Sequence, residues 1–434
     1  MANAIANKLQ SITKSTTIIK QFFEADIDWQ KKIKQTIIDA SESICVVIPD
    51  TVEDLAAIVK TAYKERWKII PCGNCSKLDW GALAQDVKLV VSTRNCDRII
   101  EHAIDDLTVT VEAGVKLADL QTSLRASDQF LPIDPAYAEV ATIGGILATA
   151  DTGSWRQQYG GIRDLVLGIS FIRGDGEIAS AGGRVVKNVA GYDLMKLFIG
   201  SYGTLGIISQ VTFRTYPIPE ASQTVVITGK AIQIDRAMAL LKNSGLTPTA
   251  ADLITASVAK KREITTKMAL LVRFQTIPES IEAQTSQLSA MVADLAVEIA
   301  SYKDEAQQQL WDRLNNTVRV PQSDGAIICK FGILPTAGVE LLEQVGKIDN
   351  DSYGMLHIGS GIGILQLAID EVSAIETIRE FCHSNSGFLT ILTAPQAIKQ
   401  NIDVWGYRGN AKEMMTTIQQ KFDPRQIFNC EFVK

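Results

Sequence analysis

The hydrophobic pattern first becomes regular near residue 44. Residues 44–48 (Ile-Cys-Val-Val-Ile) are an apolar, β-branched run, which predicts a buried strand. Asp50 followed by Glu53 resembles a capping box, and the apolar positions after it keep a helical spacing to about Arg66. Residues 67–71 (Trp-Lys-Ile-Ile-Pro) predict a second strand. The pattern therefore indicates a strand–helix–strand unit.

The segment before this unit, residues 1–40, is polar and rich in Lys. Its apolar residues recur at roughly helical spacing and are Ile18, Ile19, Phe22, Phe23, Ile33 and Ile37. We expect a helical extension that packs onto the rest of the chain.

From about residue 82 to residue 216 the pattern changes to short strands separated by glycine turns. The predicted strands are Lys88–Ser92, Thr108–Glu112, Leu165–Arg173, Glu177–Ser180 and Gly206–Thr215. Glycine is concentrated between residues 144 and 206. Tight turns between strands and close approach of a ligand to the backbone both require glycine, so both explanations remain open.

The sequence Pro217-Ile-Pro219 predicts a linker, and strand–helix alternation follows it. Strands are expected at Thr224–Thr228, Leu253–Ala256 and Met268–Arg273, with helices at Ile234–Asn243 and Ile281–Leu295. The predicted organisation is an extension (1–40), a first domain (41–220), a second α+β domain (221–410) and a C-terminal segment (411–434).

Composition places the chain among globular proteins. It has 434 residues, 46% hydrophobic and 21% charged, with a formal net charge of −6. That charge argues against a nucleic-acid partner, which usually meets a basic face. No signal peptide or membrane span is expected. Seven cysteines in a chain of this size indicate a reducing cytosol rather than a disulfide framework.

Several kinds of catalytic site are excluded by missing motifs. Three histidines without a His-x-x-His pair, and one Cys-x-x-Cys without a second, cannot build a zinc site or an iron–sulfur cluster. Dinucleotide-binding, P-loop and nucleophile-elbow motifs are also missing, and Gly359–Gly363 has the spacing of a hairpin turn. The sequence Cys72-Gly73-Asn74-Cys75 is either a redox dithiol or a turn whose backbone amides face an anion.

Five glycine-rich motifs occur in order between residues 142 and 206. They are Thr142-Ile143-Gly144-Gly145, Tyr159-Gly160-x-x-Arg163-Asp164, Gly174-Asp175-Gly176, Lys187-Asn188-x-Ala190-Gly191-Tyr192-Asp193-Leu194 and Gly200-Ser201-Tyr202-Gly203-Thr204-Leu205-Gly206. This series resembles the FAD-binding domain of the vanillyl-alcohol oxidase, or PCMH, type. Residues 150–168 and 182–193, and a C-terminal Phe422-Asp423-Pro424-x-x-Ile427-Phe428-Asn429, are most similar to the FAD-binding subunits of glycolate dehydrogenase complexes (glycolate oxidase, E subunit).

The resemblance implies an α+β fold, with a PCMH-type FAD-binding domain in two subdomains and a ferredoxin-like cap domain. It also implies noncovalent FAD, since no histidine lies between residues 60 and 80 to tether it, although Cys72 or Cys75 could attach it. Glycines would leave backbone amides bare for the pyrophosphate. The residues expected to contact FAD are Cys72, Gly73, Asn74, Cys75, Ser76, Asp134, Pro135, Thr142, Ile143, Gly144, Gly145, Ala148, Thr149, Gly153, Gly206, Ile207, Ile208 and Asn429.

Oxidation of a 2-hydroxy acid requires a hydride acceptor, a base and a cation for the carboxylate. His357 follows an apolar run and precedes a glycine-rich turn, so it is the candidate base. The candidate cations are Arg273, Arg313, Arg319, Lys330 and Arg408. The related catalytic subunit carries a His-x-Gly-Asp-Gly-Asn-x-His motif, of which the stretch from His357 to Gly363 keeps the first His and the glycines but not the acid, the Asn or the second His.

The resemblance therefore implies a cytoplasmic subunit that oxidises glycolate or a similar 2-hydroxy acid. Its partners would be a paralogous flavin subunit and an iron–sulfur subunit, through which it could associate with a membrane. A non-catalytic FAD-holding scaffold and a stand-alone oxidase of another small hydroxy acid are the alternatives.

Overall fold

The computed structural model describes residues 2–38, 40, 43–184, 192–323, 325–368 and 371–428. Within them the chain forms two compact units. The first comprises the residues up to Asp151, Gly161–Pro217 and the residues from Tyr407, and the second comprises Thr152–Gly160 and Ile218–Gly406. The first unit thus includes both ends of the chain, and the second begins with a nine-residue segment taken from within the first.

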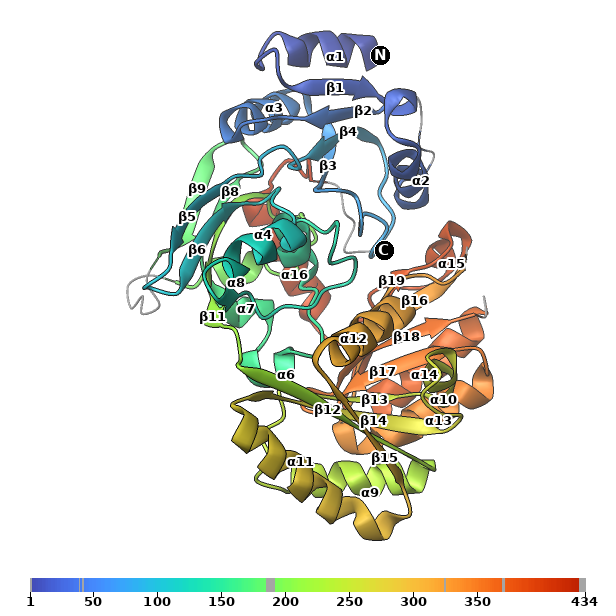
Figure 1. Cartoon of the computed structure of the whole chain (residues 1–434). Helices are drawn as coiled ribbons and strands as arrows, with labels where there is room; N and C mark the ends of the chain where they lie inside the picture. Colours follow the sequence, from blue (N-terminus) through green and yellow to red (C-terminus); the bar gives the residue numbers. More distant parts are fainter. Residues whose placement is uncertain are drawn as a thin grey trace. The chain divides into compact units, whose positions relative to one another are not determined.

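The first unit opens with a four-stranded sheet in the order β1-β2-β4-β3 (Figure 1). Its strands are β1 (Ile18–Gln21), β2 (Cys45–Ile48), β3 (Lys68–Cys72) and β4 (Val87–Ser92), and its helices are α1 (Ala2–Gln10), α2 (Ile27–Thr36) and α3 (Val52–Glu65), with a 3₁₀ turn at Phe22–Glu24. Strands β2, β3 and β4 are parallel. Alternate residues of these strands belong to two separate apolar clusters. Both faces of the sheet are therefore covered, as is typical of parallel sheets.

Two local details differ from the sequence prediction. Residues 18–21, expected to be helical, form β1 and pair antiparallel with β2, because the edge of β2 offers backbone partners to an extended segment. Helix α3 is capped by Thr51, whose side chain accepts from the Asp54 amide, and not by Asp50. Asp50 instead accepts a hydrogen bond from the Asn95 side chain.

The rest of the first unit is an antiparallel sheet in the order β5-β6-β10-β8-β9. Its strands are β5 (Ile99–Ala103), β6 (Thr108–Glu112), β8 (Val166–Ile172), β9 (Ile178–Gly182) and β10 (Ile207–Arg214), and β7 (Gln129–Phe130) pairs with β11 (Tyr216–Pro217). The helices are α4 (Leu117–Arg125), α5 (Ile143–Thr149), α7 (Ile162–Leu165), α8 (Met195–Phe198) and α16 (Ala411–Phe422). One apolar cluster joins this sheet to α4, α5 and α8.

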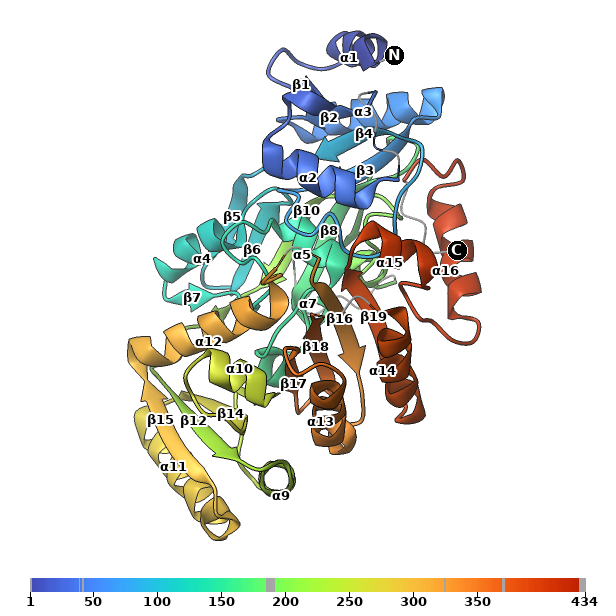
Figure 2. The same ribbon diagram turned by 90° about the vertical axis from the view of Figure 1, so that its right-hand side faces the viewer.

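The second unit is built on one eight-stranded antiparallel sheet in the order β15-β12-β14-β13-β17-β18-β16-β19 (Figure 2). The strands are β12 (Ala221–Gly229), β13 (Ala250–Ile254), β14 (Met268–Thr276), β15 (Glu298–Lys303), β16 (Ile327–Gly332), β17 (Tyr353–His357), β18 (Ile362–Leu367) and β19 (Phe388–Thr393). The helices are α6 (Arg156–Tyr159), α9 (Ala231–Lys242), α10 (Ala256–Lys261), α11 (Pro278–Val292), α12 (Asp304–Arg319), α13 (Gly338–Ile348), α14 (Val372–Ser384) and α15 (Gln396–Asn401), with 3₁₀ turns at Ala293–Leu295 and Pro335–Ala337.

This sheet consists of two ferredoxin-like halves. In each half the chain runs β-α-β-β-α-β, with the short helix α10 added between β13 and β14 of the first half, and the strand order is 4-1-3-2, first over β12–β15 and then over β16–β19. The halves join edge to edge through β13 and β17, the second strand of each, which pair antiparallel. The predicted ferredoxin-like cap domain is therefore present as two copies fused into one sheet. A repeat of about one hundred residues was not expected from the sequence.

The two faces of the sheet differ in chemistry. Helices α9, α11, α13 and α14 bury one face in a large apolar cluster that includes Leu253, Leu270 and Leu356. Side chains alternate along a strand, so Asp252, Leu271 and His357 lie on the opposite face. That opposite face carries the charged and polar residues, and α12 contacts strands in both halves there.

Candidate functional site

A loop with two cysteines follows β3 in the first unit. The main chain of Cys72 accepts from the Thr93 amide at 2.9 Å. The Ser92 hydroxyl donates to the Gly73 carbonyl at 2.8 Å, and the Asn74 side chain donates to Val140 O at 2.9 Å. The strands β3 and β4 and the segment before α5 thus hold this loop in place.

Helix α5 packs directly against the loop. Thr142 caps the helix and accepts from the Gly145 amide at 3.4 Å. A Cβ on Gly73 would lie 1.9 Å from Thr142 Oγ1, so only glycine allows this approach. The Gly144 amide donates to Ala113 O at 2.8 Å, and a Cβ on Gly144 would lie 2.9 Å from the Ala113 Cβ. The expectation that Gly144 leaves its amide bare is therefore wrong, because this glycine is required for packing.

These elements border a pocket with about 820 Å³ of empty space that is open to solvent. Thirteen of the residues expected to contact FAD line this pocket, and they are Cys72, Gly73, Asn74, Cys75, Ser76, Thr142, Gly144, Gly145, Ala148, Thr149, Gly206, Ile207 and Ile208. Their role as FAD contacts stays a prediction, but the structure brings them together.

The remaining expected contacts lie elsewhere. Ile143 is fully buried in the apolar cluster of the first unit and its amide donates to Val115 O, so its side chain does not line the pocket. Asp134 and Pro135 are not among the lining residues, and Gly153 belongs to the second unit. Asn429 lies outside the described residues, as do Lys187, Asn188, Ala190 and Gly191 of the fourth motif.

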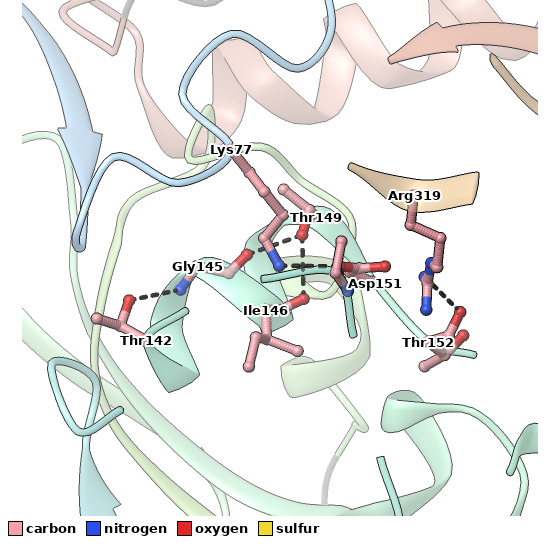
Figure 3. A network of polar contacts seen from close by, with 9 residues as sticks. Lys77, Thr142, Gly145, Ile146, Thr149, Asp151, Thr152 and Arg319 are labelled. Carbon is pink, nitrogen blue, oxygen red and sulfur yellow. Dashed lines mark hydrogen bonds and ion pairs between the residues drawn. The ribbon is translucent and has the colours of Figure 1, made fainter. Parts of the chain in front are cut away.

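A buried ion pair in the pocket wall was not anticipated. Lys77 Nζ lies 3.0 Å from Asp151 Oδ2, and both side chains are at least 96% buried (Figure 3). Asp151 Oδ2 also accepts from the Ala136 amide at 2.9 Å, and the Lys77 ammonium lies 5.5 Å from the centre of the Trp80 ring. Lys77 and Trp80 line the pocket. No sequence motif singled them out, because their position depends on how the loop after β3 folds.

The residues of the pocket fit a flavin dinucleotide. The Trp80 Nε1 donor is buried and has no hydrogen-bond partner among the described residues, so a ligand acceptor would satisfy it. Gly203, at φ +75°, lies against Pro71, and a Cβ there would be 2.5 Å from the proline ring. The walls are mostly apolar with a few polar groups, which suits a ring system with polar edges.

The C-terminal segment returns to the strand that leads into this loop. The Ile69 amide of β3 donates to Ile427 O at 2.6 Å, and Ile69 forms a parallel bridge with Phe428. Asp423 accepts from the Phe428 amide at 2.7 Å, and its burial raises the pKa of this carboxyl group. The C-terminal segment therefore packs on the first unit as far as Phe428.

His357 lies at the end of β17 in the second unit, and is 4% exposed. Its Nδ1 lies 2.7 Å from Oδ1 of Asp252, the residue directly opposite on β13. The Ser154 hydroxyl donates to Oδ2 of the same carboxylate at 2.5 Å. His357 Nε2 has no hydrogen bond to any residue that the structure describes. Neither Asp252 nor Ser154 was expected from the sequence, because the contact of Asp252 with His357 spans 105 residues and that of Ser154 with Asp252 spans 98.

The candidate cations differ in burial. Arg273 and Arg319 are both 3% exposed, Lys330 on β16 is half-buried, and Arg313 and Arg408 are exposed. Arg273 stacks on the Trp311 ring at 4.5 Å and, two residues from Leu271 on β14, shares the face of Asp252. Arg319 donates to Thr152 O at 2.9 Å.

Two negative observations apply to the described part of the chain. No helix there is both long and apolar enough to cross a bilayer. No cluster of three or more His, Cys, Asp or Glu side chains suited to a metal ion lies there either.

Known proteins are similar to part of this chain. Residues 43–182 match the family model described as FAD binding domain. Glycolate oxidase subunit GlcD of Bacillus subtilis is 33% identical over 42% of this chain and 38% of its own length, and subunit GlcE of Escherichia coli is 34% identical over 44% and 53%. A probable mitochondrial D-lactate dehydrogenase of Danio rerio is 36% identical over 43% and 38%. The chain therefore covers about half or less of each curated relative.

The whole chain resembles known structures at much lower identity. The structure of p-cresol methylhydroxylase with bound substrate has a TM-score of 0.75 at 12% identity and covers 98% of this chain and 95% of that one. At this identity the likeness concerns the fold alone. Residues 43–182 are therefore similar to the FAD binding domain family, and the chain has a fold similar to that of p-cresol methylhydroxylase.

Proposed function

We propose that this chain is the FAD-binding subunit of a glycolate dehydrogenase complex, or of a closely similar 2-hydroxyacid dehydrogenase. The observation that carries the proposal is a buried imidazole, His357, held by a carboxylate at 2.7 Å in a chain that also has an FAD-binding domain. The matched relatives are named for oxidising glycolate and D-lactate, which are both 2-hydroxy acids.

The pocket after β3 would hold FAD without a covalent bond. The loop Cys72–Ser76 and Gly145 would approach the pyrophosphate closely, and the Trp80 Nε1 donor would find an acceptor on the cofactor. No histidine occurs between residues 60 and 80, so a histidyl bond to FAD cannot form in this loop. Cys72 and Cys75 are the residues of the loop whose side chains have the chemistry for a covalent bond to FAD. When bound, FAD supplies the hydride acceptor that the reaction requires.

His357 would act as the base. With Nδ1–H donating to Asp252, the lone pair of the neutral imidazole is on Nε2, which can accept the hydroxyl proton of the substrate. Asp252 then stabilises the imidazolium that forms, and the Ser154 hydroxyl fixes the second carboxylate oxygen. The role of the carboxylate is to hold the imidazole in one tautomer.

The substrate carboxylate requires a cationic side chain as its partner. A side chain that is already buried loses little further hydration when the substrate binds. Arg273 is the candidate we favour, because it is already buried and lies on the same face of the sheet as Asp252. Stacking on Trp311 orients its guanidinium plane and keeps it charged.

Electrons would leave through partner subunits. The chain has no cysteine quartet for an iron–sulfur cluster. The similarity to two differently named glycolate oxidase subunits supports a complex of several chains, in which a paralogous flavin chain and a separate iron–sulfur chain would take part.

The test begins with the purified full chain. We expect bound FAD that is released on denaturation, and bleaching of its visible absorption by glycolate, D-lactate or D-2-hydroxyglutarate without oxygen. We expect weak dye-linked turnover by the chain alone and a rise of about 10²–10⁴-fold when the paralogous and iron–sulfur subunits are added. His357→Gln should abolish substrate bleaching, while His102→Gln, a change in the first unit, should not.

Three results would contradict parts of the proposal. Flavin that stays on the denatured chain would exclude noncovalent binding. Robust turnover by the chain alone would favour the stand-alone oxidase. Flavin that no hydroxy acid reduces, in a complex whose activity is unaffected by His357→Gln, would favour the non-catalytic scaffold.

A further inference from the structure

The two cysteines of the pocket loop lie close enough to react with each other. The Cys75 thiol donates a hydrogen bond to Cys72 Sγ at 3.5 Å. A disulfide requires about 2.05 Å between the sulfurs. A shift of about 1.5 Å, within a loop whose centre is Gly73-Asn74, would close the gap.

These cysteines differ from the others in the described chain. Cys45, Cys96, Cys329 and Cys382 are fully buried thiols in apolar clusters or against main-chain oxygens. Cys72 alone among the six described cysteines is half-buried, and it lines the solvent-open pocket. A small thiol reagent can therefore reach Cys72, and its neighbour at 3.5 Å can complete the bond.

We propose that Cys72 and Cys75 form a reversible dithiol–disulfide pair, and that closing it weakens the binding of FAD. The oxidant class is a low-molecular-weight disulfide such as oxidised glutathione. The proposal rests on FAD binding in this pocket and is independent of the hydroxy acid that the protein oxidises.

The exchange balances in two steps. The Cys72 thiolate attacks one sulfur of oxidised glutathione, so a mixed disulfide forms and one glutathione thiolate leaves. The Cys75 thiolate then attacks Cys72 Sγ, and the second glutathione leaves. Two protein thiols lose two electrons in all, and one glutathione disulfide gains them to become two thiols.

The coupling to FAD follows from how the loop is packed. Gly73 has no room to move toward α5, because even a Cβ there would lie 1.9 Å from Thr142 Oγ1. Its carbonyl is held by Ser92, and the Cys72 carbonyl by Thr93. Contracting the loop must therefore displace these contacts and the backbone amides that border the pocket. Hydrogen bonds weaken steeply when a donor moves by about an ångström, so we expect the oxidised loop to bind FAD about tenfold more weakly.

Burial slows the second step at neutral pH. Burial raises the pKa of the Cys75 thiol well above its usual range, and its hydrogen bond to Cys72 adds to this effect. Only a small fraction of Cys75 is thiolate at pH 7, so ring closure should accelerate as the pH rises toward 9.

The experiment equilibrates the full-length protein in buffers with defined ratios of reduced to oxidised glutathione. After acid quenching and alkylation, mass spectrometry should show that Cys72 and Cys75 lose two hydrogens together. FAD affinity, measured by flavin fluorescence, should fall about tenfold on oxidation and recover on reduction. By linkage, saturating FAD should shift the midpoint of oxidation toward more oxidising buffers by the same factor.

Variants separate this proposal from non-specific oxidation. Cys72→Ser and Cys75→Ser should each remove the dependence of FAD affinity on the glutathione ratio, whatever affinity the variant has in reducing buffer. Cys96→Ala, a change at a buried cysteine of the same unit, should leave the dependence intact. A stable glutathione adduct on Cys72 without a Cys72–Cys75 bond would overturn the proposal, as would equal FAD affinity of the oxidised and reduced protein.

Discussion

Asp252 and His357 lie directly opposite each other on β13 and β17, the two strands that join the ferredoxin-like halves of the second unit. Their side chains meet at 2.7 Å on the polar face of the sheet. Each of the two strands is the second strand of its half, so the pair lies at the junction between the two copies of the repeat. A carboxylate from one half thus orients an imidazole from the other.

Asp252→Asn tests this arrangement. An Asn can turn its amide toward Nδ1, which favours the tautomer with the proton on Nε2, and that nitrogen can no longer accept a proton. We expect substrate-driven flavin reduction to slow by about 10²–10⁴-fold with FAD affinity unchanged. Stopped-flow absorbance across a range of pH measures the effect.

Two control variants define the role of Asp252. Ser154→Ala removes the hydrogen bond to Oδ2 and should slow reduction much less, because the contact with His357 remains. Asp252→Glu should restore part of the rate and of the pH profile. If Asp252→Asn lowers only the thermal stability and not the rate, the carboxylate has a structural role.

Gly144 and Gly145 are neighbours that should respond differently to alanine. A Cβ on Gly144 would lie 2.9 Å from the Ala113 Cβ, so Gly144→Ala should cost about 1–3 kcal/mol of unfolding free energy through overpacking. A Cβ on Gly145 has one neighbour within 4 Å, Thr142 Oγ1 at 3.3 Å, so Gly145→Ala should fold normally. Its methyl group would narrow the pocket, and FAD affinity should fall.

Thermal unfolding of the FAD-free protein and fluorescence titration with FAD separate these two effects. The contrast fails if Gly145→Ala binds FAD as tightly as the wild type, or if Gly144→Ala retains the full unfolding temperature.

The buried pair of Lys77 and Asp151 invites a double-mutant cycle. Lys77→Met removes the ammonium beside a carboxylate that is 98% buried, and Asp151→Asn removes the carboxylate beside that ammonium, so each should cost about 3–5 kcal/mol. The double variant should cost clearly less than the sum, because the interaction between the two charges is lost only once. Urea unfolding of the four proteins measures the coupling. Additive costs would show that the two charges are stabilised separately.

The sequence patterns predicted many strands of the first unit and of the first ferredoxin-like half but no individual element after Leu295, and the failures have physical causes. Strand β5 escaped notice because Ile99 and Ile100 are exposed and give no alternation. Helix α5 has two glycines in seven residues, which suggested a loop, but tertiary contacts with Ala113 and the Thr142 cap stabilise it. The sequence of α5 alone does not show these tertiary contacts, and the sequence of β5 alone does not show its pairing with β6.

The candidate site was predictable where motifs are continuous in sequence. The loop Cys72–Ser76 and the Thr142–Gly145 turn meet in one pocket as expected. Asp252 was invisible because its pairing with His357 spans 105 residues and depends on strand register. The side chain of Ile143 was expected in the pocket, but it lies with Ile146 and Leu147 on the face of α5 that packs into the core, at helical spacing.

Asp423 should give the first unit a distinctive dependence of stability on pH. This carboxyl group is fully buried, and burial raises its pKa, although the Phe428 amide donates to it at 2.7 Å. The folded state therefore holds the proton more tightly than the unfolded state, in which the pKa is about 4. The stabilising contribution is fully present below about pH 4 and is lost as the pH rises through the folded-state value.

Asp423→Asn removes the titration but keeps an oxygen that can accept from Phe428. Relative to this variant, the wild type should lose stability as the pH rises from about 4 to 7, and the variant should be at least as stable at neutral pH. Urea midpoints measured at intervals across this range give the difference directly. As a control, the urea midpoint of Asp119→Asn, a change at a side chain that is 68% exposed, should vary with pH as that of the wild type does. If the urea midpoints of the wild type and of Asp423→Asn change with pH in the same way, the folded state does not raise the pKa of Asp423, and the prediction is wrong.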